Sequence, residues 1–378
     1  MSIEFNEEQR MWRDTLHTFM EKEVGREYTR AHDASREFPW EIYRKMGELG
    51  WLGLLLPEDD GGVAADPIMF AIFCEAIAKY SLDTAACMMT SMFTATNISA
   101  HGTPAQKQQY LPAFLRGERT FSIAITEPQS GSDAAAARTK ATRDGDGWVL
   151  NGSKTFCSGA HIPGTAIVLL ARTGEERYKG LSMFILPNDA PGLTITKLNT
   201  IVRRSLGTTQ LYLDNVRLPA DSLIGEVGEG WTYIGEHLEH ERLSLAASYI
   251  GNAATALDDT IRYTKDRKAF GRSISEFQVM KHRMVDGAIA LEAARLLTYS
   301  AAQKMTRGER AVKEVSMAKV FAADALFKIS FDGMQALGGY SQLPEQDMER
   351  YFREAKHAMV GGGTNEIQRS IIAKEMGL

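Results

Sequence analysis

The feature that most constrains this chain is a hydrophobic period that changes twice along it. Up to about residue 117, apolar side chains recur every three to four positions, as in amphipathic helices. From about 118 to 225 they gather instead in short β-rich runs separated by glycine, proline and asparagine turn signals. After Gly230 the helical period returns and continues to Leu378. This order predicts an α+β fold, mainly α, with a small antiparallel β domain between helical segments.

Three domains follow from these changes of period. We expect an N-terminal helical domain at 1–117, a middle β domain at 118–226 and a C-terminal four-helix bundle at 227–378. Long helices in the bundle are expected near 230–264, 276–306, 310–337 and 364–376.

Capping and turn signals locate some element ends. Asn6 and Gln9 form a capping-box pattern, and Pro39, Pro67 and Pro104 each occupy a plausible first helical position. In the middle block we expect tight turns at 144–147 and at the pair Asn151-Gly152. These signals set the boundaries of the predicted elements.

Composition excludes several classes of protein. Lys and Arg number 43 against 48 Asp and Glu, so there is no broad basic surface for nucleic acid. The three cysteines form no CxxC pair, which argues against a disulfide framework and a cysteine zinc site and favours a cytoplasmic setting. No apolar run reaches the roughly 18 residues of a membrane span, and no signal-peptide pattern is present, so membrane insertion and secretion are not expected.

One loop carries the most specific motif. Residues 126–133 (Thr-Glu-Pro-Gln-Ser-Gly-Ser-Asp) offer backbone N–H groups and hydroxyls suited to a flavin edge, although an ordinary Asx-type turn at Asp133 would have the same composition. The segment is similar to the Thr-Glu-Pro-Gly-Ala-Gly-Ser-Asp loop of the acyl-CoA dehydrogenase family and departs from it at Gln129 and Ser130. The resemblance covers essentially the whole chain and implies FAD as the cofactor.

A second motif, residues 151–159, resembles the family segment in which an aromatic residue covers the flavin and a hydroxyl bonds its N5 atom. Phe156 and Ser158 would take these roles, where the family often has Trp and Thr; taken alone, Phe156 is better explained as sheet core. In this block the resemblance implies FAD contacts by Ile123, Ile125, Thr126, Gly131, Ser132, Phe156 and Ser158, with Ser132 also contacting substrate.

Two C-terminal segments resemble the elements through which one family subunit contacts the FAD of its neighbour. They are residues 266–271 with the following Phe277-Gln278, and residues 335–339. Arg267 would pair with the pyrophosphate, although a basic helix end is a common alternative. A site shared between subunits implies a homo-oligomer, and we expect a tetramer. The implied cofactor contacts are Arg267, Phe270, Phe277, Gln278, Gln335, Gly339, Thr364 and Glu366.

The catalytic base departs from the commonest family pattern. Many members carry a Glu directly before Gly-Thr in the C-terminal segment, but Gly362 stands there in this chain. The isovaleryl-CoA and long-chain branches carry the Glu before an Arg on another helix, and the match here is Glu241-Arg242. The resemblance therefore makes Glu241 the base, gives the Gly362 N–H a role in holding the thioester carbonyl, and implies substrate contacts by Glu239, Arg242 and Gly363.

Glu241 has two other interpretations. It could be one of several solvated helix charges. It could also bind a metal with His237 and His240, which share its helical face by spacing, but HExxH is absent and no metal is expected.

The resemblance implies an FAD-dependent acyl-CoA dehydrogenase. Glu241 would remove the α-proton while the β-hydride passes to flavin N5, giving a 2-enoyl-CoA, and electrons would pass to an electron-transfer flavoprotein. Alternatives are an enoyl-CoA reductase running the reverse reaction, an oxidase, or a CoA-ester-binding homologue without redox turnover, the last motivated by the glycine at 362.

Overall fold

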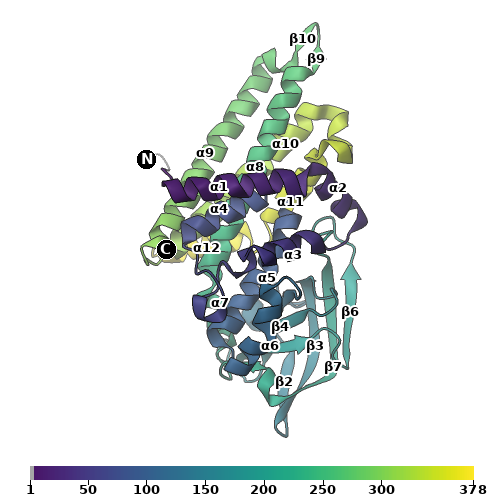
Figure 1. The fold of residues 1–378 in the computed structure, drawn as a ribbon, viewed down its shortest axis with the longest axis vertical. Coiled ribbons are helices and arrows are strands. Elements are labelled where there is room, and N and C mark those ends of the chain that lie inside the picture. The colour runs from purple at the N-terminus through teal and green to yellow at the C-terminus, as the bar shows by residue number, and fades with distance from the viewer. Residues whose placement is uncertain (1–3) are drawn as a thin grey trace. The chain divides into compact units, whose positions relative to one another are not determined.

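A computed structural model describes residues 4–378 and divides the chain into two compact units. The first contains the chain up to Ala34, Asp66–Ala85 and Glu239–Leu378; the second contains Ser35–Ala65 and Ala86–Leu238 (Figure 1). Helix α5 (Leu82–His101) begins in the first unit and ends in the second. The expected order of N-terminal helices, central sheet and C-terminal helical bundle is confirmed.

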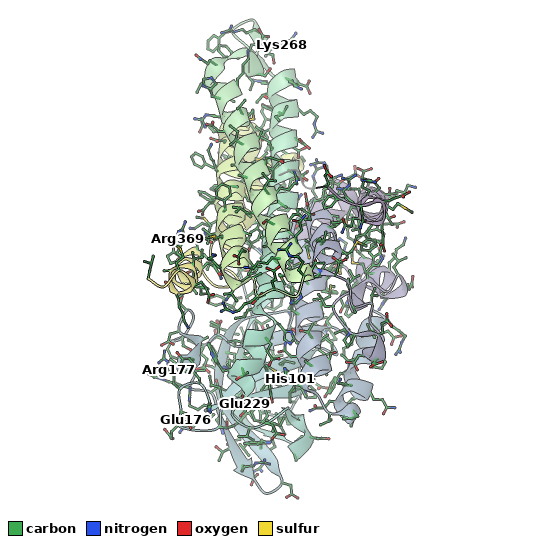
Figure 2. The ribbon with its side chains drawn as sticks, turned by 90° about the vertical axis from the view of Figure 1, so that its left-hand side faces the viewer. His101, Glu176, Arg177, Glu229, Lys268 and Arg369 are labelled. Atoms are coloured by element: carbon green, nitrogen blue, oxygen red, sulfur yellow. The ribbon has the colours of Figure 1, made fainter. Side chains whose placement is uncertain are left out.

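The first unit is helical apart from one short hairpin. Its longest members, α8 (Leu238–Asp266) and α9 (Gln278–Thr306), are joined by the hairpin of β9 (Lys268–Ala269) and β10 (Arg272–Ser273), and Figure 2 shows Lys268 at the far end of these helices. The remaining helices are α1 (Glu7–Phe19), α2 (Gly25–Ser35), α4 (Pro67–Ile77), α10 (Val312–Leu337), α11 (Met348–Ala358) and α12 (Asn365–Glu375).

Local signals explain where several helices start. Asn6 and Gln9 form the predicted reciprocal capping box of α1. Pro67 is the first residue of α4, and the Asp66 side chain accepts from the N–H groups of Ile68 and Met69. The expectation for Pro39 is wrong by one position, because α3 (Trp40–Glu48) begins after it.

The predicted helix at 230–264 is interrupted. The structure has a short α7 (Gly230–Glu236), then His237, and then α8. His237 therefore does not share a continuous helical face with Glu241, which removes the spacing argument for a metal site built from those two residues.

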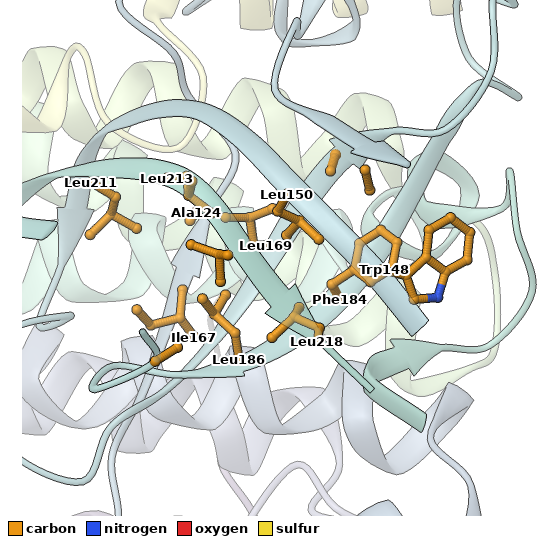
Figure 3. Close-up of a cluster of buried hydrophobic side chains, with 14 of the residues drawn as sticks. Ala124, Trp148, Leu150, Ile167, Leu169, Phe184, Leu186, Leu211, Leu213 and Leu218 are labelled. Carbon is orange, nitrogen blue, oxygen red and sulfur yellow. The ribbon is translucent and has the colours of Figure 1, made fainter. Parts of the chain in front are cut away.

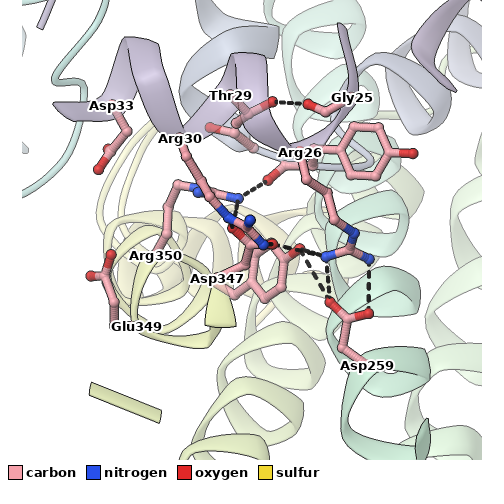
Figure 4. Close-up of polar contacts among 12 residues, drawn as sticks. Gly25, Arg26, Thr29, Arg30, Asp33, Asp259, Asp347, Glu349 and Arg350 are labelled. Carbon is pink, nitrogen blue, oxygen red and sulfur yellow. Dashed lines mark hydrogen bonds and ion pairs between the residues drawn. The ribbon is translucent and has the colours of Figure 1, made fainter. Parts of the chain in front are cut away.

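A charged network ties α2 to α8 and to the start of α11. Arg26 Nη1 lies 2.7 Å from Asp259 Oδ2 and 2.9 Å from Asp347 Oδ2, and Arg30 Nη2 lies 2.7 Å from Asp347 Oδ2 (Figure 4). Burial opposes ionisation of Asp347, but Arg30, Arg350 and Arg26 together lower its pKa below the ordinary value. The fully buried carboxylate is thus kept charged by arginines from elements far apart in sequence.

The second unit is built on an eight-stranded sheet in the order β6-β7-β3-β2-β4-β5-β8, with β1 paired to β4. Pairing is antiparallel except for β1–β4 and β2–β4, which are parallel. The strands are β1 (Phe121–Ala124), β2 (Lys140–Asp144), β3 (Gly147–Ser158), β4 (Ala166–Arg172), β5 (Leu181–Pro187), β6 (Leu193–Leu198), β7 (Thr208–Leu218) and β8 (Leu223–Ile224); α6 (Pro104–Leu115) also belongs to this unit.

Alternating apolar side chains from these strands form the core of the sheet domain. Leu150, Leu169 and Leu211 are fully buried, and Trp148 meets Phe184 edge-on with ring centroids 5.1 Å apart (Figure 3). This packing fixes the faces of β3 and β4, and hence the direction in which the residues at their ends point.

The turn expected at Asn151-Gly152 is wrong. Both residues lie inside β3, where the pairing with β7 shifts register between Leu150 and Gly152. A Cβ on Gly152 would lie 2.6 Å from Thr139 Oγ1, so the glycine permits a close approach within a bulged strand. Across residues 4–378, none of the helices is both long enough and apolar enough to cross a membrane.

Candidate active site

The loop at 126–133 is anchored to strand β3 by a buried ion pair. Lys154 Nζ lies 2.8 Å from Glu127 Oε1, and the two side chains are 0% and 2% exposed. The same ammonium donates to the Ile125 carbonyl at 3.0 Å, just after β1. The two sequence motifs that resemble flavin-binding segments are therefore held together by one charge pair, which no sequence motif marks.

Further hydrogen bonds complete the surroundings of Glu127. Its carboxylate accepts from the N–H groups of Arg138 at 2.7 Å and Thr139 at 2.9 Å. Burial disfavours its charge, but Lys154 and these donors outweigh burial and lower the pKa of Glu127 to about 2. The loop at 126–133 is thus anchored by the Glu127 carboxylate, which stays ionised at neutral pH.

Phe156 has an unusual backbone and an unusual exposure. Its φ is +58°, and it sits where the β3–β7 register shifts between Thr155 and Cys157. A left-handed conformation costs a bulky residue roughly 1–2 kcal/mol, yet the side chain is 63% exposed and is not packed in the sheet core. The core interpretation of Phe156 is therefore wrong, and an exposed aromatic held at this cost suits a ligand that would cover it.

Three hydroxyl side chains belong to the same two segments, the loop at 126–133 and the end of β3. Thr126 and Ser158 are half-buried and Ser132 is exposed. Within residues 4–378 none of these hydroxyls hydrogen-bonds another protein group, which leaves them available to a polar ligand. Among the other predicted flavin contacts, Ile123 and Ile125 are half-buried and Gly131 is exposed with nothing within 4 Å of an added Cβ. The residues present thus fit the edge of an isoalloxazine ring.

Glu241 lies in the first turn of α8 and is half-buried. Desolvation raises the pKa of its carboxyl above the ordinary value, against the smaller opposing effects of Arg242 and Lys319. Within the described chain its carboxylate accepts no hydrogen bond. A poorly solvated carboxylate with a raised pKa suits a proton acceptor near neutral pH.

Gly362 lies beside this carboxylate. A Cβ built on Gly362 would be 3.6 Å from Glu241 Oε1 and 2.2 Å from Leu245 Cδ1. The φ of Gly362 is +64°, a conformation that favours glycine. The two candidate positions for the base, 121 residues apart by their numbers, therefore converge on one place in the fold.

A buried lysine supports the glycine-rich turn. Lys319 Nζ donates to the Gly363 carbonyl at 2.9 Å and to Asn365 Oδ1 at 3.1 Å. Gln368 Nε2 donates to the Gly362 carbonyl at 3.0 Å. Desolvation lowers the pKa of the fully buried Lys319 to about 8, although Asp324, Glu366 and Glu241 favour its charged form. Lys319 and Gln368 were missed because no sequence motif marks them.

The other predicted substrate contacts differ in their surroundings. Arg242 is buried, its Nε atom has no hydrogen-bond partner within residues 4–378, and desolvation lowers its pKa. Glu239 accepts from the Ala311 N–H at 2.9 Å, at the start of α10. The substrate roles of both residues, and of Gly363, stay predictions.

Two of the predicted C-terminal cofactor contacts, Arg267 and Gly339, lie at one cavity. Arg267, Gly338, Gly339 and Tyr340 help to line a cavity of about 550 Å³, in which the Arg267 guanidinium lies over the Tyr340 ring at 5.9 Å. Thr364 caps α12 by accepting from the Ile367 N–H, and the remaining residues of the set are exposed or half-buried: Phe270, Phe277, Gln278, Gln335 and Glu366. A phosphate-bearing group fits this combination of arginine and glycine backbone.

The second unit thus presents a strained, exposed aromatic on its sheet, and the first unit holds a desolvated glutamate beside a glycine turn. Family models match the chain in three successive parts: the acyl-CoA dehydrogenase N-terminal domain at 6–118, the middle domain at 122–216 and the C-terminal domain at 228–377. The chain belongs to the acyl-CoA dehydrogenase family.

Individual relatives align over nearly the whole length. The chain is 35% identical to the mitochondrial short-chain specific acyl-CoA dehydrogenase of Homo sapiens, covering 98% of this chain and 90% of that protein. It is 34% identical to the 3-(aryl)acrylate reductase of Clostridium sporogenes, covering 98% and 99%. The crystal structure of an acyl-CoA dehydrogenase from Geobacillus kaustophilus is 31% identical, with a TM-score of 0.94 and full coverage of both chains.

Proposed function

We propose that this protein is an FAD-dependent acyl-CoA dehydrogenase in which Glu241 removes the α-proton of an acyl-CoA thioester to give a 2-enoyl-CoA. The observation that carries the proposal is the 3.6 Å between Glu241 Oε1 and a Cβ at Gly362. A carboxylate from α8 thus reaches the place where many family members are expected to carry theirs. The family match supports the reaction class, and the geometry supports the choice of base.

The cofactor would be held by residues already described. Thr126, Ser132 and Ser158 would donate to the flavin edge, and Phe156 would cover one face of the ring. When bound, FAD would supply the acceptor for the hydride that leaves the β-carbon. The Gly362 N–H would hold the thioester carbonyl, and Lys319 would keep the glycine turn in place by its bond to the Gly363 carbonyl.

The purified protein is expected to be yellow and to bleach on anaerobic addition of a good acyl-CoA. A panel of straight, branched and aromatic acyl-CoA thioesters, followed by flavin absorbance, tests the function and ranks the substrates. A colourless protein that still binds CoA esters would instead support a binding homologue, and a yellow protein that no thioester bleaches would contradict dehydrogenation.

A reductase is the second candidate, favoured by the similarity to a 3-(aryl)acrylate reductase. The same residues can run the chemistry in reverse, with Glu241 returning a proton to the α-carbon. Chemically reduced protein that is reoxidised faster by an arylacryloyl thioester than by an electron-transfer flavoprotein would favour this direction. The opposite ranking would favour a dehydrogenase that passes its electrons to such a flavoprotein.

Arg267→Ala is expected to weaken FAD retention, because a charge-assisted pair to phosphate is worth roughly 1.5–3 kcal/mol. Fluorescence of free flavin after gel filtration measures the loss, and Arg369→Ala, which removes an exposed arginine on α12, is the control (Figure 2). Equal FAD retention in the two variants would remove Arg267 from the cofactor site.

We propose that the protein is a cytoplasmic homotetramer, and the hairpin that follows Arg267 supports association between subunits. Phe270 at its tip is 95% exposed with φ +52°, so a strained aromatic lies uncovered at the end of the helix pair. A neighbouring subunit is the partner that we propose for it. Sedimentation of the flavin-loaded protein as a monomer would contradict this arrangement.

A further inference from the structure

Two histidines and a glutamate that play no part in the proposed dehydrogenation lie together in the second unit. His101 ends α5, Glu236 ends α7, and His237 follows it directly. One ligating atom from each of the three residues lies within 4.8 Å of those of the other two. We propose that His101, Glu236 and His237 bind one divalent transition-metal ion of the zinc type.

The donor set suits such an ion. Two imidazole nitrogens with one carboxylate oxygen are ligands that Zn²⁺, Co²⁺ and Ni²⁺ accept, and three protein ligands leave a fourth tetrahedral position for water. Metal–ligand distances near 2.0–2.2 Å place tetrahedral donors roughly 3.4 Å apart. His101 Nε2 and Glu236 Oε2 are now 2.7 Å apart, and the Glu236 side chain is 47% exposed and free to adjust.

The His101 imidazole is held before any ion arrives. Its ring stacks on Tyr233, with centroids 3.7 Å apart and planes inclined by 18°, and only 16% of its side chain is exposed. Tyr233 precedes Glu236 by three residues on α7, so the stacking partner and the carboxylate ligand lie on one face of that helix. The Tyr233 hydroxyl accepts from the Glu226 N–H at 3.0 Å, which fixes the tyrosine in turn.

The local electrostatics favour a cation. The cluster lies at the C-terminal end of α5, a helix of 20 residues, and at the C-terminal end of α7, and the last carbonyls of a helix carry partial negative charge. Across residues 4–378, the only ion-pair partner of Glu236 is His101, with no lysine or arginine in contact. A divalent ion would offset the carboxylate and both helix ends.

The ion would fasten the end of α5 to the junction that precedes α8. His237 separates α7 from α8. This break places Glu236 and His237 beside His101, which is 135 positions from Glu236 in sequence. The ligand set therefore differs from the group suggested by helical spacing, which joined His237 to His240 and Glu241.

Cobalt is the probe that decides the proposal. Full-length flavin-loaded protein, stripped of metals with a chelator, is titrated with Co²⁺ and followed by the visible bands of tetrahedral Co²⁺ at wavelengths beyond the flavin absorption. We expect one Co²⁺ per chain, displacement by Zn²⁺, and a higher melting temperature in the presence of either ion. His101→Asn and Glu236→Gln should each weaken Co²⁺ binding by at least about tenfold.

Two control variants make the same chemical changes elsewhere. Glu229→Gln alters an acid at the other end of α7, and His282→Asn removes an exposed histidine on α9; both should bind Co²⁺ as the unaltered protein does (Figure 2 labels His101 and Glu229). Absence of tetrahedral bands in the unaltered protein overturns the proposal. So does binding that persists in folded His101→Asn and Glu236→Gln, because the ion would then lie elsewhere; if either fails to fold, His237→Asn takes its place.

Discussion

Glu241→Gln is expected to lower the rate of flavin reduction by acyl-CoA at least about 10²-fold, because an amide cannot accept the α-proton. The fold should be intact, since the carboxylate accepts no hydrogen bond within the described residues and glutamine has the same shape. Stopped-flow reduction under anaerobic conditions is the measurement. Glu292→Gln, an exposed acid on α9, should react at the original rate.

The pH dependence of the flavin reduction rate gives a second test of Glu241 as the base. A base must be ionised to act, and desolvation raises the pKa of Glu241. The reduction rate of the unaltered protein should therefore fall as the pH drops through that raised pKa. Glu241→Gln should lose this acidic limb; a variant that keeps both the rate and the limb would place the base elsewhere.

Moving the carboxylate to residue 362 should restore part of the rate. In Glu241→Gly with Gly362→Glu, the new Cβ starts 3.6 Å from the original Oε1 position. Recovery should be incomplete, because a non-glycine residue at φ +64° costs roughly 1–2 kcal/mol and the Cβ would approach Leu245 Cδ1 to 2.2 Å. Adding Leu245→Ala should increase the recovery, with Glu241→Gly alone as the inactive reference. No recovery in a folded protein that retains FAD would argue against a shared position.

Lys154→Met is expected to lower the free energy of unfolding by roughly 3–5 kcal/mol, because it leaves the Glu127 carboxylate buried without its cation. The urea midpoint measures the loss, and Lys154→Met with Glu127→Gln should regain much of it. Arg177→Met breaks the solvent-exposed pair with Asp133 on the same loop and should leave the midpoint nearly unchanged (Figure 2). Equal midpoints for Lys154→Met and Arg177→Met would show that the buried pair contributes little.

The stability of the protein in acid should also depend on the Lys154–Glu127 pair. Folding lowers the pKa of Glu127 from 4.5 to about 2, so its contribution to stability is complete above pH 4.5 and is lost as the pH falls towards 2. Lys154→Met should show a smaller loss of stability across this interval than the unaltered protein. An identical acid profile in both proteins would assign the acid sensitivity to other carboxylates.

Features that depend on neighbouring residues could be predicted from the sequence. The order of helices, strands and helices followed from the period of the apolar side chains. The capping box of α1 followed from the spacing of Asn6 and Gln9, and the structure contains it. These features involve hydrogen bonds and side-chain contacts between residues at most four positions apart, so a short stretch of chain contains all the information. The family motifs are equally local, and they located the exposed Phe156 and the desolvated Glu241.

Tertiary structure decided the features that join distant segments. Asn151-Gly152 lies in a bulged strand instead of a turn, and Thr139, far from it in sequence, leaves no room for a Cβ at position 152. Lys154 pairs with Glu127, Lys319 donates to the Gly363 carbonyl, and His101 pairs with Glu236. The partners are separated by 27, 44 and 135 residues in sequence. A charged side chain has no period that marks its partner, and its energy depends on desolvation and distance, which exist only once the chain has folded.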